Sequence, residues 1–89
     1  MSWTTRIITR AECKICKAYI DRLRKAGYDF QIMEESPENS KQLDEWKIEQ
    51  VPVVQILVDG KLVPGGQMPS GTFSPLAIRK HAQRLGLRS

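Results

Sequence analysis

Apolar and polar residues in the first third of the chain predict a strand, a helix and a second strand. Residues 4–9 are rich in β-branched side chains and end at a polar cluster, which is typical of a strand. Helical spacing then predicts a helix from about Cys13 to Ala26, closed by Gly27. Its apolar residues are Cys16, Ile20 and Leu23, with Ile15 and Tyr19 beside them. Residues 28–32 alternate apolar and polar, which predicts a half-buried strand near a sheet edge.

The middle of the chain predicts a second helix and a strand that is buried on both faces. Ser36 and Pro37 fit the N-cap and the first position of a helix. This helix would carry its apolar residues at Leu43 and Trp46. Residues 53–58 read Val-Val-Gln-Ile-Leu-Val, so we expect them to form a central strand of the sheet.

Turn residues divide the last third of the chain. Asp-Gly at 59–60 predicts a tight hairpin turn, after which residues 61–63 pair back as a short strand. The segment 65–72 holds three glycines and one proline, so we expect a loop there. Ser-Pro at 74–75 again fits a helix start, and Gly86 closes this last helix. The apolar residues at helical spacing are Ile78, Ala82 and Leu85.

The predicted order of elements defines a fold class. A strand, a helix and a strand form a right-handed βαβ unit, which requires parallel strands. The later elements form a hairpin backed by a helix. Together they predict an α/β fold in which a mixed four-stranded sheet carries helices on both faces. We expect the 89 residues to form a single domain, 1–89.

Charge and hydropathy exclude some classes of function. Fourteen Lys and Arg against ten Asp and Glu leave a formal net charge of +4, which would favour an anionic partner. The basic residues are scattered, so we do not expect nucleic-acid binding. No stretch approaches the roughly 18 apolar residues of a membrane span. Residues 1–6 lack the layout of a secretory signal, so we expect a cytoplasmic protein without membrane attachment.

The candidate chemistry lies in two cysteines, Cys13 and Cys16, which are the only ones in the chain. A close pair fits a working dithiol in a reducing cytosol better than a disulfide framework spread along a secreted chain. Cys13 opens the predicted helix, where free N–H groups and the helix dipole stabilise a thiolate. We expect Cys13 to attack a substrate disulfide and the more shielded Cys16 to resolve the mixed disulfide.

Three alternative roles for the cysteine pair are weaker. A structural disulfide across a two-residue spacer would constrain the unfolded chain very little. A zinc site needs four ligands, and His81, the remaining candidate, lies far along the chain in a predicted helix, so we expect no metal. The third alternative is two buried cysteines without a redox role. They would have this spacing, at a helix start after a strand, only by coincidence. The redox interpretation is therefore preferred.

Three separated motifs resemble glutaredoxins, and the resemblance covers nearly the whole chain. They are the Cys-x-x-Cys at a helix start, Val51-Pro52 before an apolar strand, and Gly65-Gly66 after a hairpin. The resemblance implies a thioredoxin-like fold. It also implies a cis bond between Val51 and Pro52, facing the cysteines and aiming the Val51 backbone at an extended substrate. An ordinary trans proline that opens a strand is the alternative.

The resemblance further implies a glutathione site. Arg10, three residues before Cys13, would pair with a glutathione carboxylate, unless it is a solvated surface arginine. Gly65 and Gly66 would let the ligand backbone approach closely. Lys14 would place a further cation beside the reactive thiol.

The chain departs from the family pattern in two places. Glutaredoxins carry an aspartate shortly after the double glycine, whereas here Gln67 and Ser70 offer only uncharged acceptors. The family's aromatic residue between the cysteines is replaced by Lys14-Ile15. Lys47 would supply a second positive charge or stay solvated. These departures weaken the expectation of glutathione binding more than that of dithiol chemistry.

The resemblance implies a glutathione-dependent thiol–disulfide oxidoreductase. It would reduce a disulfide-containing protein such as ribonucleotide reductase, or mixed disulfides of proteins with glutathione. Glutathione would be a co-substrate, no cofactor would be tightly bound, and the chain would act as a monomer. Two alternatives stay open: a glutaredoxin-like electron donor reduced by thioredoxin reductase, and a non-enzymatic iron–sulfur carrier. Carriers of that kind usually have a single cysteine in a Gly-Phe-Ser context, which this sequence lacks.

Overall fold

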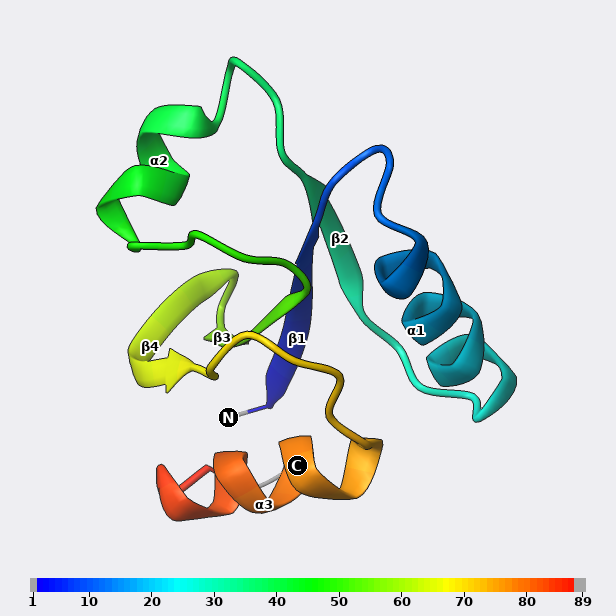
Figure 1. Cartoon of the computed structure of the whole chain (residues 1–89). Coiled ribbons are helices and arrows are strands. Elements are labelled where there is room, and N and C mark those ends of the chain that lie inside the picture. Colours follow the sequence, from blue (N-terminus) through cyan, green and yellow to red (C-terminus); the bar gives the residue numbers. More distant parts are fainter. Residues whose placement is uncertain (1, 88–89) are drawn as a thin grey trace.

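Helices and strands follow one another in the predicted order in the computed structural model, which describes residues 2–87 (Figure 1). The elements are β1 (Trp3–Thr9), α1 (Lys14–Lys25), β2 (Gln31–Glu34), α2 (Ser40–Glu45), β3 (Val53–Val58), β4 (Lys61–Gln67) and α3 (Pro75–Arg84). Within residues 2–87, none of the helices is both long and apolar enough to cross a membrane.

The strands form one mixed sheet in the order β2-β1-β3-β4. β1 runs parallel to β2, whereas the pairs β1–β3 and β3–β4 are antiparallel. The hairpin between β3 and β4 turns at Asp59 and Gly60, whose φ angles are 53° and 78°. Positive φ at both positions is what a two-residue turn between twisted strands requires. The predicted sheet, the parallel βαβ unit and the hairpin are confirmed.

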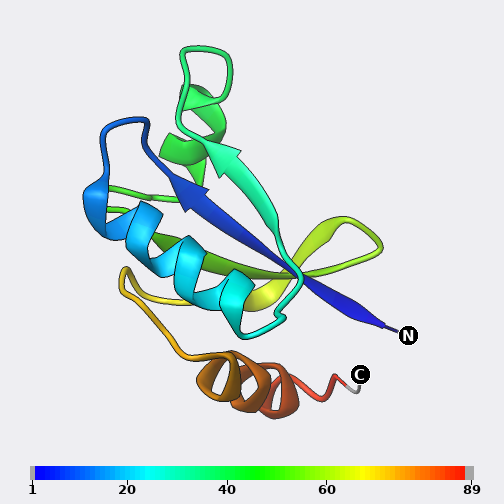
Figure 2. The ribbon, with the colours of Figure 1, turned by 90° about the vertical axis from the view of Figure 1, so that its right-hand side faces the viewer.

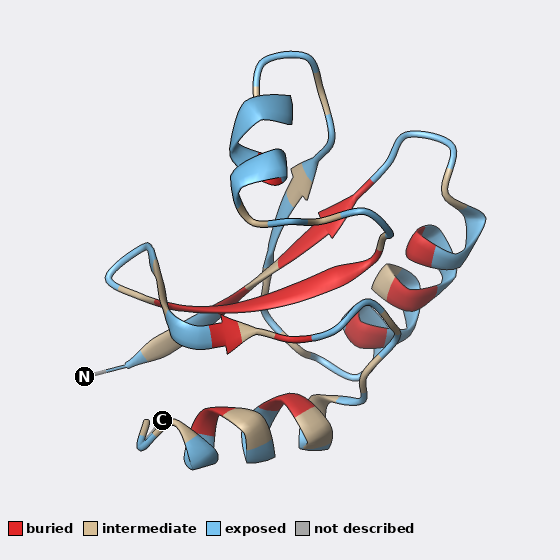
Figure 3. Cartoon of the chain, turned by 60° about the vertical axis from the view of Figure 1, so that its left-hand side comes forward, coloured by how far each residue is buried: buried red, intermediate tan, exposed pale blue. Residues whose placement is uncertain are grey.

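Helices cover both faces of the sheet, as predicted (Figure 2). α1 and α3 pack on one face, where they enclose the larger core cluster, and α2 packs on the other. The larger cluster consists of Ile7, Tyr19, Leu23, Val54, Ile56, Met68, Ile78 and Ala82. The smaller cluster consists of Ile8, Leu43 and Val53. β3 is buried along nearly its whole length, as expected for a central strand between two layers (Figure 3).

Local capping accounts for the positions of α1 and α3, which lie where the sequence predicts. Cys13 is the N-cap of α1, and Gly27 follows the helix with a φ of 76°. This left-handed conformation at the end of a helix favours glycine. Ser74 caps α3, because its Oγ accepts a hydrogen bond from the Ala77 N–H at 3.2 Å, and Pro75 occupies the first turn. Both helix predictions are confirmed.

The predicted start of α2 at Ser36 is wrong. Asn39 is the N-cap, and the helix begins at Ser40. Residues 36–39 form a turn, in which the Asn39 N–H donates to the Ser36 carbonyl at 3.2 Å, three residues back rather than the four of an α-helix. The Asn39 side chain supports this turn, since its Oδ1 accepts from the Ser36 N–H and its Nδ2 donates to the Glu34 carbonyl, both at 2.8 Å.

β2 lies at the sheet edge as predicted, but it begins at Gln31 rather than at residue 28. The chain first completes the end of α1, where the Tyr28 N–H donates to the Leu23 carbonyl at 3.0 Å. Phe30 still packs against the larger core cluster, as does Tyr28. Ile32, by contrast, is 43% exposed.

β4 is longer than predicted. Residues 64–67, most of which we expected in a loop, continue the strand to Gln67. The pairing with β3 shifts register between Gln55 and Leu57, which lets the longer strand follow its neighbour. Because β4 is an edge strand, Pro64 can lie in it without an N–H to donate.

A chain of polar contacts crosses the α2 face of the sheet. Gln55 on β3 is fully buried, and its side-chain oxygen accepts from Arg6 Nε at 2.9 Å. Its amide nitrogen donates to Gln67 Oε1 at 2.9 Å, and Gln67 Nε2 donates to the Trp46 carbonyl at 2.9 Å. The Arg6 guanidinium lies over the Trp46 ring, 4.8 Å from its centroid, and burial lowers the pKa of Arg6. Both polar atoms of the buried side-chain amide therefore have a hydrogen-bond partner.

Replacing Gln55 with leucine tests this network. Leucine has a similar size, so the main change is that Arg6 Nε and Gln67 Oε1 lose their partner while they stay partly buried. We expect the free energy of unfolding to fall by about 2 kcal/mol in urea denaturation of the oxidised protein. Lys41→Ala, at an exposed position of α2, is the control and should be close to neutral. A stability unchanged by Gln55→Leu would contradict an energetic role for the network.

Candidate active site

The two cysteines form a disulfide across the first turn of α1. Their Cα atoms are 5.2 Å apart. Cys13 is partly exposed, whereas Cys16 is only 1% exposed. The Cys13 Sγ accepts a hydrogen bond from the Cys16 N–H at 3.1 Å, so the N-cap side chain is already bonded to the helix start. The same N–H and the helix dipole would stabilise a thiolate on Cys13 after reduction.

The Val51–Pro52 bond is cis, as the resemblance implied. The β1–β3 register places Ile8 opposite Val53. Pro52 therefore lies at the end of the sheet where β1 runs into the turn that leads to Cys13. The views agree that this bend of the chain lies beside the N-terminal end of α1 (Figures 1–3).

The loop between β4 and α3 is held beside these elements. Tyr19 on α1 is buried and donates its hydroxyl to the Phe73 carbonyl at 2.5 Å. Burial raises the pKa of Tyr19 to about 12, so the hydroxyl keeps its proton at neutral pH. The Gly71 N–H donates to the Pro52 carbonyl at 3.0 Å. The loop is therefore hydrogen-bonded both to the cysteine helix, through Phe73, and to the cis proline, through Gly71.

Gly71 borders the candidate site through its bond to Pro52, and the sequence motifs did not point to it. It lies in the predicted loop 65–72, at the opposite end from the adjacent glycines Gly65 and Gly66. The signal that could have identified Gly71 is the pair Ser70-Gly71, which ends three residues before the Ser74 cap of α3.

Gly65 and Gly66 lie elsewhere in the structure. Both belong to β4, beside the middle of β3 rather than at its cysteine end. A Cβ on Gly66 would lie 2.7 Å from the Ile56 carbonyl oxygen, so the close approach is made by the protein's own sheet. The Gly65 carbonyl is within 2.8 Å of His81 Nε2 on α3. Close packing accounts for Gly66, and a φ of 76° accounts for Gly65.

The remaining predicted binding residues are divided between the site and its surroundings. Lys14 is exposed in the first turn of α1, next to Cys13. Gln67 uses its amide in the network on the α2 face. It also borders a hollow of about 260 Å³ between segments 47–50 and 67–70. The first segment precedes the cis proline in sequence, and the second starts at the end of β4. Lys47 lines the same hollow and has a φ of 58°.

Arg10 is neither free nor simply solvated. Its Nε is 2.7 Å from Glu35 Oε2, and its Nη2 donates to the Glu49 carbonyl at 3.1 Å. The Arg10 carbonyl in turn accepts from the Cys13 N–H at 3.3 Å. The arginine therefore belongs to the turn that presents Cys13, but its charge is balanced by the carboxylate of Glu35.

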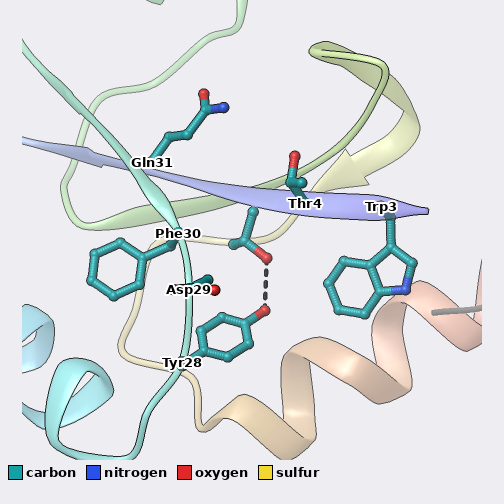
Figure 4. A pocket seen from close by; sticks show the side chains of 7 residues that line it. Trp3, Thr4, Tyr28, Asp29, Phe30 and Gln31 are labelled. Carbon is teal, nitrogen blue, oxygen red and sulfur yellow. Dashed lines mark hydrogen bonds between the residues drawn. The ribbon is translucent and has the colours of Figure 1, made fainter.

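A second hollow lies at the opposite end of β1 (Figure 4). It has a volume of about 480 Å³ and is lined by Trp3, Thr4, Thr5, Tyr28, Asp29, Phe30 and Gln31. Thr5 and Tyr28 share a hydrogen bond of 2.6 Å there. Neither cysteine borders this hollow.

Comparison with known proteins identifies the fold. The sequence matches no protein-family model, and no curated protein matches it. Among solved structures, the chain is similar to the crystal structure of thioredoxin f from spinach chloroplasts in its short form, with a TM-score of 0.69. The match covers 90% of this chain and 76% of that chain at 22% sequence identity. The fold is thus α/β and thioredoxin-like, with a Cys13–Cys16 disulfide at the start of its first helix.

Substitution of Gly66 separates packing from ligand approach. We expect Gly66→Ala to lower the free energy of unfolding by about 1–3 kcal/mol, because the new methyl group would overlap a backbone carbonyl. Thermal or urea unfolding without any ligand measures this, with Ser70→Ala as an exposed control. If Gly66→Ala left stability unchanged and reduced only turnover, contact with substrate would account for the glycine better than packing does.

Proposed function

We propose that the chain is a thiol–disulfide oxidoreductase that works through Cys13 and Cys16. The observation that carries this proposal is the pairing of a partly exposed cysteine at a helix N-cap with a buried cysteine one turn further along. The thioredoxin-like fold supports it as an analogy. A structural role for such a short disulfide loop would add little stability.

In the reaction, the Cys13 thiolate attacks one sulfur of a substrate disulfide, and the other substrate sulfur leaves as a thiolate. A mixed disulfide then joins Cys13 to the substrate. Cys16 loses its proton and attacks the Cys13 sulfur, which releases the second substrate sulfur. The protein ends with the Cys13–Cys16 disulfide, having given two electrons to the substrate. An external thiol or reductase must reduce this disulfide before the next cycle.

Exposure and hydrogen bonding support these separate roles. Cys13 is the sulfur that a substrate can reach, and it lies at the end of α1 where negative charge is stabilised. Cys16 is shielded from solvent and can react only with a sulfur brought to it. The Val51 backbone beside the helix start would pair with an extended substrate segment.

For the electron donor, we propose glutathione, with disulfide-containing cytoplasmic proteins such as ribonucleotide reductase as substrates. Arg10 supports this choice, because it lies in the turn before Cys13 and matches a carboxylate. A flavoprotein of the thioredoxin reductase type is the second candidate. Two observations favour it: Arg10 is already paired with Glu35, and Gly66 is covered by its own sheet.

Cysteine variants test the two roles. We expect Cys13→Ser to reduce disulfide exchange to the uncatalysed background, because the attacking sulfur is lost. Cys16→Ser should still turn over glutathione mixed disulfides and should accumulate a mixed disulfide on Cys13 with protein substrates. Mass spectrometry of acid-quenched reactions detects that adduct. An inactive Cys16→Ser combined with an active Cys13→Ser would reverse the assignment.

A reduction assay tests the donor. The oxidised protein is mixed with NADPH and either glutathione plus glutathione reductase or thioredoxin reductase, and NADPH consumption is followed. We expect the glutathione system to reduce the Cys13–Cys16 disulfide. Reduction by thioredoxin reductase alone would instead establish the second candidate, with the dithiol chemistry unchanged.

A further inference from the structure

We propose that Glu35 is a specificity-determining residue that competes with carboxylate-bearing thiols for Arg10. This inference rests on the proposed function. It concerns which small thiols the site accepts, and it assigns to Glu35 an inhibitory effect on the binding of anionic ones.

The contacts of Arg10 show what a carboxylate would have to displace. Its Nε faces Glu35 Oε2 at 2.7 Å, and its Nη2 donates to the Glu49 carbonyl at 3.1 Å. These two nitrogens form one side of the guanidinium fork, which is a side that binds a carboxylate through paired hydrogen bonds. An incoming carboxylate must therefore displace Glu35 or use the donors that are left.

The backbone holds Glu35 in this position. β1 and β2 pair with Thr9 opposite Glu34, and the Glu35 N–H then donates to the Thr9 carbonyl at 2.7 Å. Glu35 and Arg10 are thus the next residues along two paired strands. Their ion pair follows from the sheet register and does not depend on a chance meeting of two long side chains.

Exposure makes this competition reversible. The Arg10 and Glu35 side chains are 47% and 39% exposed, so water and salt screen their attraction. An ion pair of this kind is weak enough for an external carboxylate to replace it. Glu35 therefore lowers the affinity for an anionic ligand without blocking the site.

The charges around Cys13 support the same conclusion. The Cys13 N–H donates to the Arg10 carbonyl, so Arg10 lies in the turn that presents the reactive sulfur. With Glu35 neutralising Arg10, the exposed Lys14 remains beside Cys13, and Glu12 in the same turn opposes it. A thiol without carboxylates responds to this balance only through its thiolate. Glutathione responds through its free carboxylates as well.

The test is Glu35→Gln, which removes the charge and keeps the size. The measurement is the rate constant for reduction of the Cys13–Cys16 disulfide, followed by alkylation and mass spectrometry. Three reductants are compared: glutathione, its diethyl ester and dithiothreitol. We expect glutathione to react about two- to fivefold faster with the variant. The other two reductants should gain less, because only their thiolates respond to the lost charge. Added salt should shrink the gain.

Two further variants serve as controls. Glu38→Gln removes the same charge at an exposed position of the nearby turn and should leave all three rates unchanged. Arg10→Gln added to Glu35→Gln should abolish the gain with glutathione, because the recognising cation is gone.

The outcomes separate the inference from the proposed function. Equal glutathione rates for wild type and Glu35→Gln would overturn the inference, and so would an equal acceleration of all three reductants, which would mean an effect on the sulfurs themselves. If dithiothreitol reduced the disulfide but the reduced protein transferred no electrons to any disulfide substrate, the proposed function itself would fail.

Discussion

The antiparallel pairing of β1 with β3 is the constraint on which the rest of the structure depends. It aligns Ile8 with Val53 and Ile7 with Val54, four residues that are almost fully buried. Burial of both faces specifies this register strongly, because a shift by one residue would turn every apolar side chain to the wrong layer. The same register brings the turn before Cys13 and the cis proline to one end of the sheet, although they are far apart in sequence. The candidate site is therefore a consequence of core packing.

The sequence predicted the features that depend on neighbouring residues. Helices α1 and α3 have helical spacing and their own caps, and the Asp59-Gly60 turn has its own chemistry, so each was found. The start of α2 was missed because residues 36–39 form a turn that the Asn39 side chain supports through Ser36 and Glu34. The length of β4 was missed because a register shift against β3 decides it. The same limit applies to the site. The cysteines were predicted from their neighbours and the cis bond from the resemblance, whereas the place of Gly66 depends on strand pairing and that of Gly71 on its bond to Pro52.

The two faces of the sheet differ in how they are filled. The face under α1 and α3 holds a continuous apolar cluster. The face under the short helix α2 combines a small apolar cluster with the contacts of Arg6, Gln55 and Gln67. Hydrogen-bonded groups need defined partners, whereas apolar groups need only suitable volume. The α2 face should thus tolerate fewer kinds of substitution, although it buries less apolar surface.

The hydrogen bonds that hold the loop between β4 and α3 use its backbone atoms. The Met68 N–H, the Gly71 N–H and the Phe73 carbonyl make its three anchoring hydrogen bonds. The side chains of residues 69, 70 and 72 are exposed and take no part in them. The loop can therefore change its surface chemistry beside the cis proline while its path stays the same. Substitutions at these three positions can thus accumulate without disturbing the backbone contacts that the loop makes to β3, Pro52 and Tyr19.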